Sequence, residues 1–149
     1  MHPYVALALY LALTIGGGLL IGAVTAPGDW YQALQKPWFD PPGWVFGPAW
    51  GLLYVLIAIA GWRISRRGEL RAARIWWLQL GLNFLWPFLF FRVHATGLAL
   101  VEIVLLLAVI CAFIALTWRA DRVSALLFVP YGAWVTFATL LNGAIWWLN

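Results

Sequence analysis

Few side chains in this chain could act as acids, bases, nucleophiles or metal ligands. The only histidines are His2 and His94 and the only cysteine is Cys111, so a metal site built from these residue types is not expected. A membrane protein that ligates haem normally places histidine or methionine within its helices, and Met1 is the only methionine. The only lysine, Lys36, lies in a predicted loop, which excludes a retinal Schiff base inside a bilayer. The sequence predicts no metal site and no acid–base or nucleophilic catalytic set.

Aromatic residues are the more informative group, because the chain holds 12 tryptophans. About half lie near the ends of apolar runs, where amphipathic indole rings favour the lipid headgroup zone: Trp62, Trp76, Trp77, Trp118, Trp146 and Trp147. That explanation does not account for the others, which are Trp30, Trp38, Trp44, Trp50, Trp86 and Trp134.

Three apolar stretches carry aromatic or polar residues at helical spacing. They are Phe46, Trp50 and Tyr54; Asn83, Trp86 and Phe90; and Trp134, Ala138 and Leu141. At 1.5 Å per residue, Trp50, Asn83 and Trp134 lie roughly 9 to 13 Å from the same edge of the bilayer. An aromatic cavity with a few polar groups suits a flat, largely apolar ligand, although such stripes are also typical of ordinary packing.

Glu102 is a carboxyl group about seven residues into an apolar run. An acidic residue inside a bilayer is a functional candidate by default. Two alternatives, a neutral protonated acid and a hydrogen bond to another helix, are together favoured over that interpretation.

The elements that position these residues are predicted to be membrane helices. Of 149 residues, 65% are hydrophobic and 9% are charged, whereas soluble domains carry about 25% charged residues. This composition excludes a soluble globular enzyme. A spanning helix needs about 20 apolar residues, and the pattern predicts spans over 3–25, 44–64, 75–91, 95–118 and 123–148. The expected fold is an all-α membrane protein, a five-transmembrane-helix bundle forming one domain over residues 1–149.

The long connection between the first two spans, residues 26–43, holds Pro27, Pro37, Pro41 and Pro42. Proline restricts the backbone and lowers the entropy lost on ordering. We expect this loop to be a lid, with Trp30 and Trp38 folded over the mouth marked by Phe46 and Trp50. The alternative is an aromatic anchor at headgroup level.

Charge and glycine patterns predict orientation and packing. The loops on one side hold Arg63, Arg66, Arg67, Arg71, Arg74, Arg119 and Arg122, and those on the other hold Lys36 and Arg92. The positive-inside rule then places the N-terminus in the cytoplasm and the C-terminus outside. Gly18 and Gly22 form a GxxxG pair, which predicts close helix packing within the bundle or across a dimer.

The run Lys36-Pro37-Trp38-Phe39-Asp40-Pro41-Pro42-Gly43-Trp44-Val45-Phe46, followed by Trp50 and Tyr54, resembles the TspO/MBR family. These are the tryptophan-rich sensory proteins, related to the mitochondrial translocator protein or peripheral benzodiazepine receptor. Further matches are Gln79, Asn83, Trp86 and Pro87 in the third span, and Val129-Pro130-Tyr131, Trp134, Ala138-Thr139 and Leu141-Asn142 in the fifth. The resemblance covers essentially the whole chain.

The resemblance implies a five-helix bundle, commonly dimeric, that binds tetrapyrroles such as protoporphyrin and haem and drug-like benzodiazepine-site ligands. Bacterial members are linked to the regulation of tetrapyrrole and photosynthesis genes. By matching position, the pocket would be lined by Trp50, Tyr54, Asn83, Trp86, Trp134, Ala138 and Leu141, with Trp30, Trp38 and Pro41 as its lid. The chain departs from the animal sterol-recognition segment at Gly143-Ala144, and no Lys or Arg follows Tyr131. The family pattern assigns Glu102 no role.

Three functions stay open at this point. The first is a membrane-bound tetrapyrrole sensor or carrier without catalysis, for which porphyrin or haem is a ligand and no cofactor is required. The second is a light-dependent porphyrin-degrading enzyme with Trp50 and Trp134 as participants. The third is a scaffold that acts through a partner protein and holds lipid in its cavity. The expected partners are a flat apolar small molecule, lipid and a second copy of the chain, and not nucleic acid, because the charges cluster at span ends.

Overall fold

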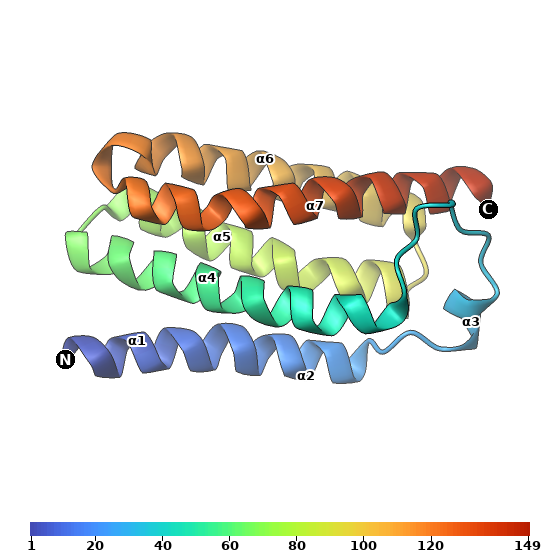
Figure 1. Ribbon diagram of the computed structural model, residues 1–149, viewed down its shortest axis with the longest axis horizontal. Helices are drawn as coiled ribbons and strands as arrows, with labels where there is room; N and C mark the ends of the chain where they lie inside the picture. Colours follow the sequence, from blue (N-terminus) through green and yellow to red (C-terminus); the bar gives the residue numbers. More distant parts are fainter.

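The computed structural model describes residues 1–149 and contains helices and turns without a β-strand. Four helices are long and apolar enough to cross a membrane: Pro3–Val24, Gly43–Arg67, Thr96–Ala120 and Arg122–Leu148. They lie side by side in an elongated bundle, with the N-terminus at one end and the C-terminus at the other (Figure 1). The all-helical membrane architecture predicted from the composition is confirmed.

The first rod of the bundle changes neighbours along its length. It comprises α1 (Pro3–Leu11), the π-helical turn η1 (Ala12–Gly16) and α2 (Gly17–Val24). In η1 the buried Thr14 donates a hydrogen bond to the backbone carbonyl of Tyr54, at 2.9 Å. Helix α1 and η1 pack on α4 (Phe46–Arg67), whereas α2 packs on α5 (Leu70–Pro87). The second half of the first rod, α2, therefore diverges from α4.

The third predicted span, 75–91, is helical, but it is not among the four helices apolar enough to cross a membrane. It forms the later part of α5 and the π-helical turn η3 (Phe88–Arg92). Polar residues lower the hydropathy of α5 as a whole: Arg71, Arg74, Gln79 and Asn83. Helix α5 nevertheless packs within the bundle, against α4 and α6 (Thr96–Ala120). Pro87 lacks an N–H and ends the regular helix where η3 begins.

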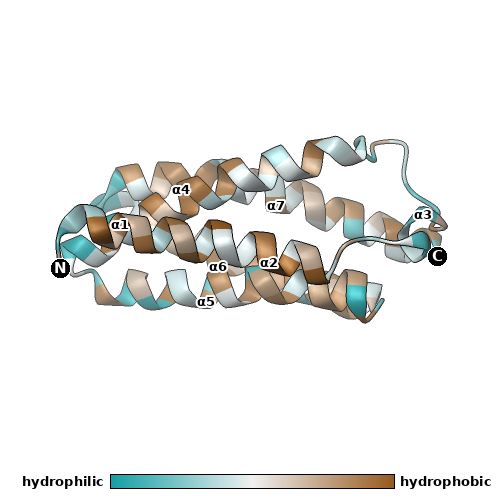
Figure 2. Ribbon diagram, turned by 90° about the horizontal axis from the view of Figure 1, so that it is seen from below, coloured by the Kyte–Doolittle hydropathy of each residue, from teal (hydrophilic) through white to brown (hydrophobic).

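The remaining elements complete the bundle and its connections. The loop after α2 contains the short helix α3 (Asp29–Gln32) and leads through the 3-10 turn η2 (Gly43–Val45) into α4, and α7 (Arg122–Leu148) ends the chain. The fully buried core lies among α4, α5, α6 and α7 and is rich in aromatic rings, including a stacked pair, Phe113 and Phe128, with centroids 4.0 Å apart. Hydrophobic residues dominate the helices in Figure 2, and hydrophilic ones gather at the N-terminal end of the bundle and in the loop before α4.

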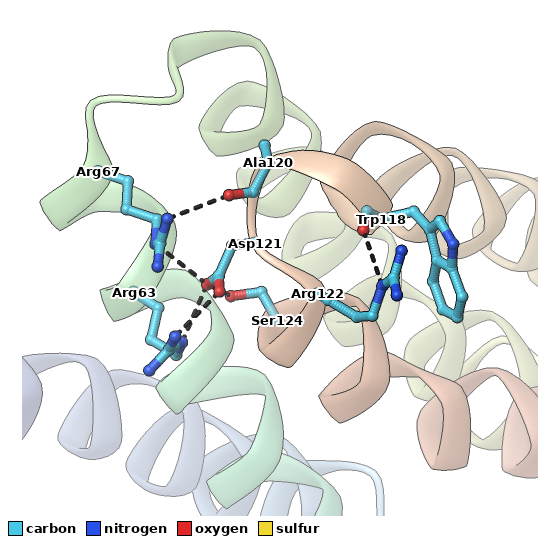
Figure 3. A network of polar contacts seen from close by, with 7 residues as sticks. All are labelled: Arg63, Arg67, Trp118, Ala120, Asp121, Arg122 and Ser124. Carbon is cyan, nitrogen blue, oxygen red and sulfur yellow. Dashed lines mark hydrogen bonds and ion pairs between the residues drawn. The ribbon is translucent and has the colours of Figure 1, made fainter.

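The arginine-rich end of the bundle is closed by a network centred on Asp121, in the turn between α6 and α7 (Figure 3). Arg63 donates to both oxygens of this buried carboxylate, each at 2.9 Å. Arg67 lies 3.6 Å from it, and the Ser124 hydroxyl donates to it at 2.5 Å. The hydrogen bond from Arg63 is the main cause that holds the pKa of Asp121 below its ordinary value. This network ties α4 to the α6–α7 turn.

Candidate functional site

A cavity of about 790 Å³ lies among α2, α4, α5, α7 and the loop before α4. All nine residues that the sequence pattern assigned to a pocket line it: Phe46, Trp50, Tyr54, Asn83, Trp86, Phe90, Trp134, Ala138 and Leu141. Helical spacing brought each triplet to one face, and the packing of α4, α5 and α7 brings the three faces together. The volume lies within the range of about 300–1,000 Å³ that is typical of small-molecule sites.

The aromatic walls of the cavity brace one another edge to face. The Trp50 and Trp134 rings are 6.3 Å apart at 87°, and Phe46 meets Trp134 at 5.9 Å and 74°. Trp86 stacks on Phe90 at 5.1 Å. Edge-to-face pairs are favoured by the quadrupoles of aromatic rings. The walls therefore hold indole faces in fixed orientations in the cavity.

The polar groups of the cavity wall are mostly satisfied within the protein. Tyr54 donates to the Oδ1 of Asn83 at 2.9 Å, and the Nδ2 of Asn83 donates to Tyr131 at 2.8 Å. Asn83 therefore finds the partners that an amide in an apolar setting needs. The buried indole N–H of Trp134 has no partner in the protein. This N–H is therefore an unsatisfied donor in the wall of the cavity.

The side-chain amide of Asn142 makes two hydrogen bonds that hold another part of the cavity wall together. The Trp86 indole N–H donates to the Oδ1 of Asn142 at 2.9 Å, and the Nδ2 of Asn142 donates to the carbonyl of Thr96 at 2.9 Å. These bonds join α5, α7 and the start of α6, and they fix the plane of the Trp86 indole.

The loop before α4 covers part of the cavity, but not with the tryptophans that the sequence suggested. Pro41 lines the cavity as expected. Trp30 does not line the cavity; it stacks on His94, with ring centroids 3.9 Å apart and planes at 6°, and meets the ring of Phe90 edge to face at 5.8 Å. Trp38 is 95% exposed and does not line the cavity. The difference arises because the loop turns Pro27, Pro41 and several polar residues toward the cavity and the Trp38 indole outward.

Other loop residues line the cavity: Tyr31, Gln32, Lys36 and Asp40. Lys36 forms no ion pair, and its ammonium group contacts the carbonyl of Leu34 at 3.3 Å and the ring of Tyr31 at 4.6 Å. Burial, together with the neighbouring carboxylate of Asp40, raises the pKa of Tyr31 to about 12. Tyr31 is therefore a neutral hydrogen-bond donor at physiological pH, and Lys36 supplies positive charge at the cavity.

Glycine faces on α2 and α4 form a wall that was not predicted as part of the site. Gly18 and Gly22 line the cavity from α2, and Gly47 and Gly51 line it from α4. A Cβ at Gly18 would collide with the ring of Tyr54, whereas one at Gly22 would meet open space. The GxxxG pair therefore faces the interior of its own bundle. The same four-residue glycine spacing in α4 was the signal that could have identified this wall.

The arrangement favours binding a flat molecule by stacking. Its lining contributes indole and phenyl faces, a few hydrogen-bonding groups and the ammonium group of Lys36. No group of three His, Cys, Asp or Glu residues that could hold a metal ion occurs in the structure.

Known proteins are similar to this chain over most of its length. Residues 6–148 match the TspO/MBR family. The chain is 40% identical to Protein CrtK of Rhodobacter capsulatus over 133 aligned residues, and the alignment covers 86% of this chain and 83% of that protein. It is 42% identical over 123 residues to the tryptophan-rich protein TspO of Archaeoglobus fulgidus, covering 80% of each chain. It is 33% identical over 138 residues to the human translocator protein, covering 87% of this chain and 82% of the human one. The chain that forms this aromatic cavity is therefore a member of the TspO/MBR family.

Proposed function

We propose that this membrane protein binds a tetrapyrrole, protoporphyrin or haem, in the aromatic cavity and acts as a sensor or carrier without catalysis. The observation that carries the proposal is the pair of perpendicular indoles, Trp50 and Trp134, in a cavity of about 790 Å³. Flat conjugated rings stack on such faces and bury much of their area. The family resemblance implies this ligand class, and the relatives named tryptophan-rich sensory protein and translocator protein agree with a sensor or carrier.

Contacts at the cavity suggest how such a ligand would be oriented. Lys36 is the cation at the mouth and would face the carboxylates of a porphyrin. The lining contains no histidine, methionine or cysteine, so stacking and hydrogen bonds, rather than iron coordination by those residues, would hold the ring. Pro41 would close the mouth. Trp30 would fix the loop through His94, and Trp38 would anchor it in the headgroup zone.

The proposal includes the architecture that the family resemblance implies. Helix α5 with η3 crosses the membrane as the third of five spans, in addition to the four apolar helices, and its polar residues Gln79 and Asn83 are buried within the bundle. Residues 1–149 form one domain, and two copies associate as a homodimer. The N-terminus is cytoplasmic, which is the orientation that the positive-inside rule predicts. Chemical crosslinking in lipid vesicles tests the dimer, and a monomeric pattern at all crosslinker concentrations contradicts it.

A titration with protoporphyrin IX and haem, followed by the shift of the porphyrin absorption band, tests the binding proposal. We expect saturable binding of both at one site per chain, and close affinities, because neither needs an iron ligand from the cavity. Binding that does not saturate, or that equals partitioning into empty detergent micelles, contradicts the proposal.

A photochemical function is the second candidate, since Trp50 and Trp134 both contact the cavity and lie 6.3 Å apart. Because both indoles line the cavity, they would lie against a bound porphyrin and could exchange electrons with its excited state. Illumination of the protoporphyrin complex separates the two functions. Degradation faster than in empty micelles, and slowed by Trp134→Phe, favours the enzyme. Equal bleaching favours the sensor or carrier.

A further inference from the structure

A smaller cavity lies at the end of the bundle opposite the loop that covers the aromatic site, where α4 ends (Figure 1). Its volume is about 290 Å³, and four residues line it: Trp62, Arg63, Arg66 and Arg67. All four belong to the last turns of α4. They share one face of the helix, because residues three and four apart are neighbours on a helix surface. None of them lines the aromatic cavity.

The guanidinium group of Arg66 is oriented by stacking and not by an ion pair. Its Cζ lies 5.1 Å from the centroid of the Trp62 ring, which is the distance of a cation–π contact. The indole of Trp62 is itself fixed, because its N–H donates to the carbonyl of Pro3 at 2.9 Å. The Arg66 guanidinium has neither an ion pair nor a hydrogen-bond acceptor in the protein. Its donors are therefore oriented but unused.

Arg63 and Arg67 also keep free donors, although both contact Asp121 (Figure 3). Arg63 donates to this carboxylate from Nε and Nη2, which leaves its Nη1 without a partner. The Nε of Arg67 lies 3.6 Å from the same carboxylate, and its Nη1 donates to the carbonyl of Ala120 at 3.1 Å, which leaves Nη2. The two side chains are 29% and 49% exposed, so neither is sealed inside the bundle.

The cavity carries an excess of positive charge. Its three guanidinium groups outnumber the carboxylate of Asp121 and the roughly half a negative charge that a helix places at its C-terminal end. The other acidic residue of this region, Glu69, is exposed and forms no ion pair. A guanidinium fork matches two phosphate oxygens at once, so oriented and unused arginine donors are suited to a phosphate.

We propose that this cavity binds the phosphate headgroup of an anionic phospholipid. The first argument is its depth. Trp62 and Arg67 lie about 7 Å apart along the helix axis, and the headgroup zone on each side of a bilayer is about 5 to 7 Å thick. A half-buried indole at the end of a spanning helix is typical of the boundary of this zone. The three guanidinium groups then lie at the level of the lipid phosphates.

Size and orientation give two further arguments for a lipid headgroup. The volume is at the lower end of the range for small-molecule sites, so the cavity suits a headgroup whose acyl chains lie outside it along the bundle. In the orientation proposed above, this end faces the cytoplasmic leaflet, which carries a negative surface potential from anionic lipids. The inference does not depend on the tetrapyrrole function, because the two cavities share no residue.

Native mass spectrometry of the full chain in detergent tests the proposal with two lipids that differ only in their headgroup. Dioleoylphosphatidylglycerol is anionic, and dioleoylphosphatidylcholine is zwitterionic with the same acyl chains. We expect the wild type to retain one phosphatidylglycerol per chain in preference to phosphatidylcholine. Arg66→Gln should weaken phosphatidylglycerol binding about fivefold, which is the effect of one basic group near a lipid headgroup.

Arg122→Gln is the matched control, because it removes the same charge at the same end of the bundle. Arg122 also stacks on an indole, with its Cζ 4.7 Å from the Trp118 ring, but it does not line the cavity (Figure 3). This variant should bind phosphatidylglycerol as the wild type does. Trp62→Leu keeps every charge but removes the surface on which Arg66 is stacked, so it should weaken binding as well, and it carries the test if Arg66→Gln does not fold.

Equal retention of the two lipids by the wild type overturns the proposal. Equal losses in Arg66→Gln and Arg122→Gln overturn it too, because they would indicate a general attraction between charges without a site. Inorganic phosphate in excess should not displace phosphatidylglycerol, since the acyl chains also contribute to binding. Displacement would assign the cavity to a free anion and not to a lipid. No porphyrin enters the measurement, so either outcome leaves the tetrapyrrole proposal to its own test.

Discussion

At the scale of single residues, the cavity wall depends on indole faces rather than on apolar volume. Trp134 contacts Phe46, Trp50 and Phe137 at ring distances of 5.5 to 6.3 Å, so its plane is fixed from three sides. A ligand that stacks on it meets a surface already ordered, and little side-chain entropy is lost on binding.

Replacing both Trp50 and Trp134 by Leu should weaken protoporphyrin binding about tenfold or more. Leucine keeps apolar bulk but removes stacking worth about 0.5–1.5 kcal/mol per aromatic pair, and 1.4 kcal/mol is tenfold in affinity. Absorbance titration measures the change. Trp147→Leu, at an 81% exposed position outside the cavity, is the matched control and should bind as the wild type does. Unchanged affinity in a folded double variant would move the site elsewhere.

At the scale of elements, two helices approach closely where a glycine faces a fixed indole. Trp76 of α5 is 1% exposed and donates to the carbonyl of Ile57 in α4 at 2.9 Å. A Cβ at Gly61 would collide with this ring. Because the indole is held by its hydrogen bond and its neighbours, it cannot move aside.

Gly61→Ala should therefore lower the thermal stability of the protein in detergent, by an overpacking cost of about 1–3 kcal/mol. Gly81→Ala is the control, because a Cβ there meets nothing within 4 Å. Since alanine is the better helix former, that variant should be neutral or slightly stabilising. Differential scanning fluorimetry compares the two, and equal melting temperatures would show that Trp76 is free to shift.

The Asp121 network joins α4 to the α6–α7 turn and predicts a pH dependence. Because Arg63 lowers the pKa of Asp121 in the folded state, the stabilisation is present above the ordinary aspartate value of about 3.9 and is lost as pH falls through the lower folded value. Asp121→Asn should lower the melting temperature at pH 7, by a loss of about 1–3 kcal/mol, and flatten the decline on acidification below pH 4. Asp29→Asn, at an exposed carboxylate without an ion pair, should do neither.

Asn149, which follows the end of α7, holds the loop before α4 through two hydrogen bonds. The backbone N–H of Gln35 donates to the Oδ1 of Asn149 at 3.1 Å, and the Nδ2 of Asn149 donates back to the carbonyl of Gln35 at 3.0 Å. Asn149→Ala should release the loop and speed porphyrin dissociation severalfold, because a covering segment mainly governs residence time. Trp38→Ala should change the rate less, since its indole is exposed. Stopped-flow displacement measures both, and equal rates in all three proteins would leave the loop as an interfacial anchor only.

At the scale of the whole molecule, charge asymmetry predicts orientation. The turns at the N-terminal end of the bundle in Figure 1, between α4 and α5 and between α6 and α7, carry the arginine-rich segments, whereas the opposite end carries Lys36 and Arg92. A reporter enzyme that folds only outside the cytoplasm should therefore be active when fused after Asn149. A fusion active only as a cytoplasmic reporter would reverse the orientation.

Local periodicity determined much of this protein before any packing was known. Composition alone predicted a helical membrane protein, and the helical repeat placed Trp50 beside Tyr54 and Asn83 beside Trp86 on faces that the structure brings to one cavity. Both results depend on neighbours within one helix, which sequence spacing specifies directly.

Only the tertiary structure decided those features of the site that depend on segments distant from one another in the chain. The divergence of α2 from α4 made Gly22 and Gly51 a cavity wall, and the path of the loop turned Trp38 outward and Pro41 inward. Asn83 acquired its partners only because α4, α5 and α7 converge on it. Spacing along one helix specifies which face a side chain shares, but not which other helix lies opposite, because that is set by the packing of the whole bundle.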